Sequence, residues 1–332
     1  MREVARGRVV IHRLASEVLR GNPLGDPTTR DLHVYLPPGH EPGTRYPALL
    51  ALTGFTGTGG MLFNLDPLGE DLARRLDRLI GRGDCPPLIV VAPDCFTRLG
   101  GNQYINSSAT GRYEDYLFSE VIPFVEGTYG VGRWGAFGKS SGGYGAMVLG
   151  MRHADVLGAI ADHSGDANFE LCYITDFPEA LDQLREAGGP ARWLERFWAD
   201  DNRHRRRHMK TLNVLAMAAH YSPNSASPHL GIDFPFDLDT GEMRLEVWER
   251  WRGWDPVHMA PHHAEALRKL SLVYVDCGVR DEFALHWGAR ALVAKLRALG
   301  VTPHYEEFDD GHMSISYRYD RSLPLLAKAL TE

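Results

Sequence analysis

The chain has 332 residues, of which 44% are hydrophobic and 24% charged, and its formal net charge is -7. This is the composition of an ordinary soluble globular protein, and it excludes a disordered or fibrous chain. The mild negative charge gives no general attraction to nucleic acid or to anionic membranes, because that attraction needs clustered positive charge. The length allows one large domain with an insertion or two ordinary domains, and we expect the former.

The cysteines and the apolar runs predict a cytoplasmic protein with reduced thiols and no membrane partner. The four cysteines show neither CxxC pairs nor the spacing of zinc ligands: Cys85, Cys95, Cys172 and Cys277. No run of roughly 18 apolar residues occurs, and the first 22 residues lack the apolar centre of a secretory signal. The one basic cluster, residues 203–210 (RHRRRHMK), is interpreted as a solvated helix face.

Strands and helices are predicted to alternate through the first half of the chain. Residues 8–14 (RVVIHRL) and 31–36 (DLHVYL) alternate polar and apolar side chains, which predicts an antiparallel entry hairpin. A buried strand at 46–52 then leads into the Gly/Thr-rich loop 53–60. The elements expected next are a helix at 68–80, a strand at 88–92, a helix at 114–126, a strand at 134–137, a helix at 142–152 and a strand at 157–161. Such alternation predicts parallel strands joined by crossover helices.

The alternation resumes only near the C-terminus, with a strand at 271–275, a helix at 284–299, a strand at 302–308 and a last helix from Ser322. Residues 165–269 break the rhythm, and we interpret them as a cap inserted into a core formed by residues 1–164 and 270–332. The whole chain is then a single catalytic domain of α/β class. Five of the seven tryptophans lie in the cap, namely Trp193, Trp198, Trp248, Trp251 and Trp254. We expect them to form mainly the cap's own core, with one or two lining an acyl or aryl pocket.

The segment 134–145 (WGAFGKSSGGYG) holds the pattern G-x-S-x-G, centred on Ser140 and placed between a strand and a helix. A serine at such a sharp turn has a strained backbone, and the glycines on either side let strand and helix approach closely. The turn raises the hydroxyl above the sheet and places the following N–H groups at a helix N-terminus. Ser140 is therefore the predicted nucleophile. The alternative, Ser141, has no glycine two residues before it.

A serine hydroxyl is a weak nucleophile unless a histidine, oriented by a carboxylate, removes its proton. In a fold of this class the order along the chain is serine, acid, histidine. Asp281 follows the strand 271–275 in CGVRDEF, and His312 lies in DDGHMS after the last strand, so they are the predicted acid and base. Asp276 and Glu282 are the alternative acids. The histidines less suitably placed are His258, His262, His263, His286 and His304.

Acyl transfer also needs donors aimed at the oxyanion, commonly two backbone N–H groups. The predicted donors are Phe55, which follows Gly54 in the loop 53–60, and Ser141, which follows the nucleophile. A merely flexible connection is the alternative for that loop. It lacks the Gly-Lys-Ser/Thr ending of a phosphate-binding loop, and no H-E-x-x-H spacing indicates a metal site. We expect neither a metal nor an organic cofactor.

These segments resemble the Putative esterase family of α/β-hydrolases, which includes esterase D (S-formylglutathione hydrolase), feruloyl esterases and the antigen 85 group. The resemblance rests on DLHVYLPPG, the LTGF loop, PDC, YEDYL, GKSSGGYGAM, CGVRDEF and DDGHMS. It implies an α/β-hydrolase fold and a Ser-His-Asp mechanism without a cofactor, carried by Ser140, His312 and Asp281. It also implies Phe55 as an oxyanion donor.

Two features depart from the esterase D pattern, namely the long insertion and the Lys139 and Ser141 flanks of the nucleophile, where His and Met are common. The sequence therefore predicts a serine carboxylesterase acting on a small or medium ester, and the natural ester is left open. An acyltransferase using the same triad and a non-catalytic binding member of the fold are the alternatives. A homo-oligomer is plausible on base rates for enzymes.

Overall fold

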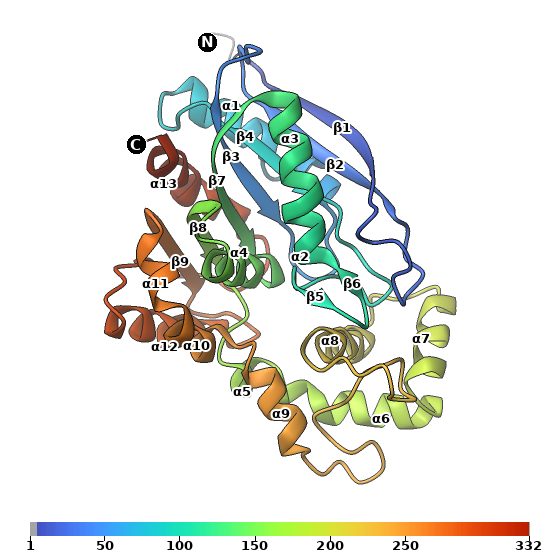
Figure 1. Cartoon of the computed structure of the whole chain (residues 1–332). Helices are drawn as coiled ribbons and strands as arrows, with labels where there is room; N and C mark the ends of the chain where they lie inside the picture. Colours follow the sequence, from blue (N-terminus) through green and yellow to red (C-terminus); the bar gives the residue numbers. More distant parts are fainter. Residues whose placement is uncertain (1–4, 332) are drawn as a thin grey trace.

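A mostly parallel sheet of eight strands forms the centre of the computed structural model, which describes residues 5–331 (Figure 1). In spatial order the strands are β1 (Arg8–Ala15), β2 (Thr29–Leu36), β4 (Ile89–Pro93), β3 (Tyr46–Leu52), β7 (Val131–Lys139), β8 (Leu157–His163), β9 (Leu272–Gly278) and β10 (His304–Phe308). Strand β2 runs antiparallel to both β1 and β4, and all other neighbours are parallel. The expected entry hairpin and mostly parallel sheet are confirmed.

Helices cover both faces of this sheet, because successive side chains of a buried strand point to opposite sides. In β3, Leu50 belongs to one core, whereas Leu49 and Ala51 belong to the other. The Leu50 core includes side chains from α3 (Ile122–Tyr129), α4 (Ser141–Arg152) and α12 (Leu285–Ala298). The opposite core contains side chains from α1 (Leu72–Gly81) and α13 (Tyr319–Thr331). The continuous apolar strands are thus buried on both faces.

Three predicted helices differ in detail from the structure. The last helix, α13, begins at Tyr319 and not at Ser322. Helix α1 begins at Leu72 and not at residue 68, because the Asp71 side chain accepts the Arg74 N–H at 3.0 Å and caps the helix there. The helix expected at 114–126 is formed by α2 (Tyr113–Asp115), a π-helical turn (Tyr116–Val121) and α3. A short hairpin of β5 (Asn106–Ser107) and β6 (Gly111–Arg112), which the sequence did not predict, precedes it.

The segment between β8 and β9 is helical, and α6 to α9 lie beyond one end of the sheet, at the bottom of Figure 1. Its helices are α5 (Phe169–Cys172), α6 (Phe177–Ala187), α7 (Pro190–Ala199), α8 (Arg206–Tyr221), α9 (Leu245–Arg252), α10 (Pro256–Met259) and α11 (Ala264–Lys269). Trp193, Trp248 and Trp251 are buried within it, and the Trp251 ring meets that of Tyr221 edge to face. These rings serve mainly the segment's own packing. Across residues 5–331, no helix combines the length and apolar character needed to cross a bilayer.

The edge strand β10, which leads to His312, is tied to the C-terminal region by Glu306. Its carboxylate accepts from Arg318 and from Arg321, the latter at 3.0 Å. Burial alone would raise the pKa of Glu306, but hydrogen bonds from Arg321, His304 and Arg318 outweigh it and lower the pKa to about 2. Because the pKa of Glu306 is lower in the folded state, the ionised carboxylate stabilises the fold above pH 4.5, its ordinary pKa. This stabilisation is lost as the pH falls toward 2.

We expect the melting temperature of Glu306→Gln to depend less on acidic pH. Between about pH 5 and pH 3 it should fall less than the melting temperature of the wild type. Thermal unfolding followed by circular dichroism at several pH values measures it. The matched control is Glu265→Gln, since Glu265 is exposed on α11 and makes no ion pair in the described part of the chain. Parallel pH profiles for Glu306→Gln and the wild type would contradict the assignment.

Candidate active site

Ser140 lies at a sharp bend between β7 and α4, with φ 59° and ψ -128°. A non-glycine residue is rare in this region of backbone space and is strained there. The Ser140 N–H donates to the His163 carbonyl at 2.9 Å, which holds the bend against the end of β8. A Cβ at Gly138 would overlap the backbone of Gly142, and one at Gly142 would overlap the Leu52 carbonyl. The two glycines therefore allow the close approach that the bend requires.

Asp281 and His312 are hydrogen bonded to each other beyond the carboxyl ends of β9 and β10, and both are buried. His312 Nδ1 donates to Asp281 Oδ2 at 2.7 Å, and Asp281 Oδ1 accepts the N–H groups of Phe283 and Leu285 at 2.9 and 3.4 Å. Burial raises the pKa of Asp281, but these hydrogen bonds and the His312 charge outweigh it, so the pKa lies below its ordinary value. The ionised carboxylate thus orients the ring with Nε2 left to act as a base.

Ser140 follows β7, and Asp281 and His312 follow the parallel strands β9 and β10. All three residues therefore lie beyond the carboxyl ends of these strands, at the same end of the sheet. Within residues 5–331 no hydrogen bond joins Ser140 Oγ to the His312 ring. In unliganded enzymes such a contact is often long and closes only when substrate binds.

Lys139, the residue before Ser140, interacts electrostatically with the carboxylate of Asp281. Burial lowers the pKa of Lys139, and the charge of Asp281 partly offsets it.

The alternative acids have other partners. Asp276 Oδ1 lies 2.6 Å from His163 Nδ1, and Asp276 Oδ2 accepts from Arg318 Nε at 2.9 Å. His163 Nε2 in turn lies 2.8 Å from Ser322 Oγ, so the chain contains a second Ser-His-Asp arrangement. Its three residues are fully buried at 0% exposure, so no substrate reaches them. Glu282 accepts the backbone N–H of His312 at 2.7 Å and so supports the loop that carries the ring.

The loop after β3 lies directly against the nucleophile. A Cβ at Gly54 would lie 3.2 Å from Ser140 Cβ and 3.1 Å from the Lys139 carbonyl oxygen. Thr56, with φ 67°, donates its N–H to the Gly100 carbonyl at 2.6 Å, which fixes the turn. Among the described residues, the N–H groups of Phe55 and Ser141 have no hydrogen-bond acceptor. Both N–H groups are thus free of other acceptors in the described residues, and the loop that carries Phe55 lies against Ser140.

We expect Gly54→Val to lower kcat/KM by roughly 100-fold to 1000-fold, because the added side chain would push the loop and its N–H group away from Ser140. Kinetics on short p-nitrophenyl esters measure the loss. The matched control is Gly127→Val, because a Cβ at that helical glycine meets nothing within 4 Å. Equal kinetics for Gly54→Val and the wild type would show that the loop does not take part in catalysis.

The alternative nucleophile, Ser141, is only 2% exposed and belongs to a buried polar cluster that the sequence did not reveal. Gln103 Nε2 donates to Ser141 Oγ at 2.9 Å, and the Ser141 hydroxyl is 3.4 Å from Asp166 Oδ2. Tyr173 donates its hydroxyl hydrogen to the same carboxylate oxygen at 2.8 Å. Burial raises the pKa of Asp166, although Tyr173 and the charge of His312 partly offset it. The Ser141 side chain is therefore held away from substrate.

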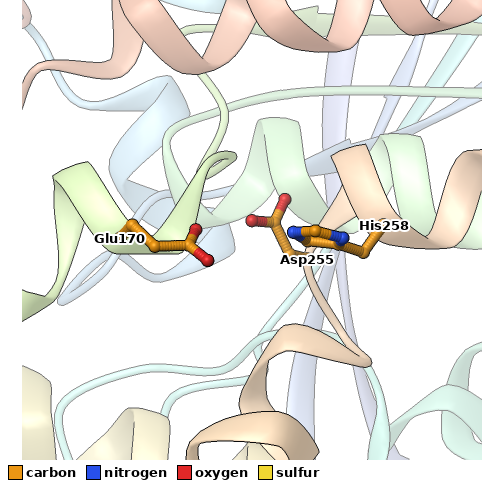
Figure 2. A group of neighbouring side chains, drawn as sticks. All are labelled: Glu170, Asp255 and His258. Atoms are coloured by element: carbon orange, nitrogen blue, oxygen red, sulfur yellow. The ribbon is translucent and has the colours of Figure 1, made fainter.

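A group outside this site has the chemistry of metal ligands. Glu170, Asp255 and His258 offer ligand atoms that all lie within 4.8 Å of one another, and Figure 2 shows their side chains converging. Asp255, however, already accepts three backbone N–H groups at 2.8 to 3.1 Å. Arg252 lies 2.9 Å from Glu170 Oε1 and 3.3 Å from His258 Nε2. The Arg252 guanidinium thus supplies the positive charge that a metal ion would otherwise bring to these side chains. Together the residues hold α5, α9 and α10 in contact.

The comparisons with known proteins agree with this architecture. The family model described as "Putative esterase" matches residues 27–323. Endo-1,4-beta-xylanase Y of Acetivibrio thermocellus is 32% identical over 115 residues, which are 35% of this chain and 10% of that protein. The chain thus spans only about a tenth of that relative's length.

Two solved structures show the same fold at low identity. A ferulic acid esterase superposes with a TM-score of 0.62 and 20% identity, covering 98% of this chain and 99% of that one. An S-formylglutathione hydrolase from Agrobacterium tumefaciens gives a TM-score of 0.56 and 16% identity, covering 99% of this chain and 97% of that one. The expected α/β-hydrolase fold is confirmed. Because the family model covers most of its length, the chain belongs to the Putative esterase family.

Proposed function

We propose that this protein hydrolyses a small or medium carboxylic ester through Ser140, His312 and Asp281. The observation that carries the proposal is the strained backbone of Ser140 at the same end of the sheet as the buried Asp281–His312 hydrogen bond. The unsatisfied N–H groups of Phe55 and Ser141 beside the nucleophile support it. The chemistry needs no metal or organic cofactor, because a base, an oriented acid and oxyanion donors suffice for acyl transfer.

The reaction has two steps. In the first, His312 Nε2 takes the proton from Ser140 Oγ as that oxygen attacks the ester carbonyl, and the N–H groups of Phe55 and Ser141 stabilise the oxyanion. The carbon–oxygen bond to the alcohol then breaks, and His312 returns the proton to the leaving oxygen. In the second step, His312 takes a proton from water as the water attacks the acyl-enzyme, the bond between Ser140 Oγ and the acyl carbon breaks, the carboxylic acid leaves, and His312 returns the proton to Ser140. Asp281 stabilises the imidazolium in both steps.

We further propose that residues 165–269 act as one cap on a single catalytic domain formed with residues 1–164 and 270–332. The contact between Trp198 Nε1 and the Arg98 carbonyl, at 3.0 Å, supports this by joining α7 to a loop of the core. Asp166, which belongs to the same segment and lies 3.4 Å from the Ser141 hydroxyl, brings that segment to the site. The protein's cytoplasmic location and oligomeric state stay predictions.

The decisive experiment for the function is covalent labelling with a fluorophosphonate, which reacts with an activated serine. We expect one labelled residue per chain, Ser140, together with hydrolysis of p-nitrophenyl acetate. A panel of acetyl, longer acyl, feruloyl and S-formylglutathione substrates would then rank the acyl groups, since the solved neighbours include a ferulic acid esterase and an S-formylglutathione hydrolase. A folded protein that neither reacts with the probe nor cleaves any of these compounds would exclude the function.

A further inference from the structure

Three large apolar side chains stand exposed on the segments that follow Asp281 and His312 along the chain. Phe283 and Trp287 are each 51% exposed, and Met313 is 63% exposed. The Phe283 ring meets the His312 ring edge to face with 4.8 Å between the ring centroids, and Met313 is the next residue along the chain. Single exposed apolar residues are normal, but apolar side chains gathered at a functional site mark a binding surface. We call these three residues the His312 patch.

The fold holds this patch in place. Asp281 Oδ1 accepts the Phe283 N–H at 2.9 Å, so the carboxylate that orients the imidazole also fixes the residue packed against it. The turn continues through Ala284, with φ 60°, whose carbonyl accepts the Trp287 N–H at 3.1 Å. The Arg290 guanidinium lies 4.7 Å from the centroid of the Trp287 ring. Trp287 is thus supported by a neighbour while half of it stays exposed.

We propose that the His312 patch binds the alcohol part of the ester, and that this alcohol has a bulky apolar body such as an aryl or long alkyl group. The inference rests on the proposed function. When the tetrahedral intermediate collapses, the proton on His312 Nε2 passes to the departing alcohol oxygen. That oxygen must therefore lie within hydrogen-bond distance of the imidazole. The rest of the alcohol extends from this oxygen, and the exposed side chains beside the imidazole contact it.

The acyl part lies elsewhere, since its carbonyl carbon is bonded to Ser140 and its oxygen is held at Phe55 and Ser141. Charge disfavours an anionic alcohol. Arg290, which stacks on Trp287, is paired with Glu307 at 2.6 Å, and the exposed Glu282 carboxylate beside Phe283 would repel an anion. Exposed apolar surface binds apolar groups through the hydrophobic effect.

Two ester series separate the alcohol site from the acyl site. In the first, acetate is constant and the alcohol is methanol, hexanol or 2-naphthylmethanol. In the second, methanol is constant and the acid is acetic, hexanoic or naphthoic acid. We expect wild-type kcat/KM to rise with the size of the alcohol. In Trp287→Ala the ratio of kcat/KM for the 2-naphthylmethyl ester to that for the methyl ester should fall by roughly fivefold to tenfold, as expected for the loss of one ring contact. The ranking of the acids should be retained.

Phe283→Ala should reduce the alcohol preference in the same way, and Trp287→Phe should restore most of it. Ile11→Ala is the matched control, because Ile11 is 59% exposed but lies on β1, at the opposite edge of the sheet from β10. Equal losses in both series, or an unchanged alcohol preference in Trp287→Ala, would overturn the proposal. Fluorophosphonate labelling of Ser140 in the same variant separates this failure from failure of the esterase mechanism.

Discussion

Ser140→Ala should lower the turnover of short p-nitrophenyl esters by roughly a million-fold, by analogy with other serine hydrolases that lose the nucleophile. Without the hydroxyl no acyl-enzyme can form, and only the oxyanion donors and binding remain to accelerate the attack of water. The measurement is kcat under saturating substrate, with the enzyme checked for folding by circular dichroism. Because the residual rate is small, the variant must be purified from a host that lacks competing esterases.

The second Ser-His-Asp arrangement provides an internal control. Ser322 lies 2.8 Å from His163 Nε2 and is fully buried, so Ser322→Ala should keep both its fluorophosphonate label and its activity. Ser140→Ala should lose both. If Ser140→Ala hydrolyses esters at close to the wild-type rate, the nucleophile has been assigned wrongly. If the label moves to Ser322 in the folded protein, the buried arrangement is accessible and its role must be revised.

The sequence was informative wherever function depends on local chain geometry. G-x-S-x-G predicts a strained turn because only glycines tolerate the approach of strand and helix around Ser140, and the structure has that backbone. The apolar run 46–52 predicts the strand β3 with the same bounds, since a buried parallel strand is apolar throughout. Asp281 and His312 were predicted because chain order in this fold restricts the acid and base to loops after late strands, and in the structure the two side chains are hydrogen bonded.

The rest depends on contacts between residues far apart in the chain, which no local pattern encodes. Asp276 pairs with His163 across 113 positions, so its place in a separate network could not be predicted from its strand. Asp166 follows β8 in the segment HSGDAN, and that loop position was the only signal of its proximity to Ser141. The exposure of Phe283 and Trp287 was equally invisible, because an aromatic residue near a helix start is usually buried.

The two Asp–His pairs of this protein predict opposite outcomes for the same substitution. Asp281→Asn should lower kcat by roughly 10,000-fold, because an amide can hold His312 in the wrong tautomer and cannot stabilise the imidazolium. Its effect on stability should be smaller, although the wild-type carboxylate does contribute. Because the pKa of Asp281 is lower in the folded state, the ionised carboxylate stabilises the fold above pH 3.8, its ordinary pKa. This stabilisation is lost as the pH falls below that value.

Asp276→Asn should instead destabilise the fold. It removes a buried charge that is bonded to His163 and, at 2.9 Å, to Arg318. Breaking a buried pair in this way costs about 3 to 5 kcal/mol, because the fully buried His163 loses its carboxylate partner, although Arg318 keeps Glu306. Urea unfolding gives the stability of both variants, and kcat per titrated active site gives their activity. A 10,000-fold loss of kcat in folded Asp276→Asn, with Asp281→Asn active, would make Asp276 the catalytic acid, since each substitution removes only one candidate carboxylate.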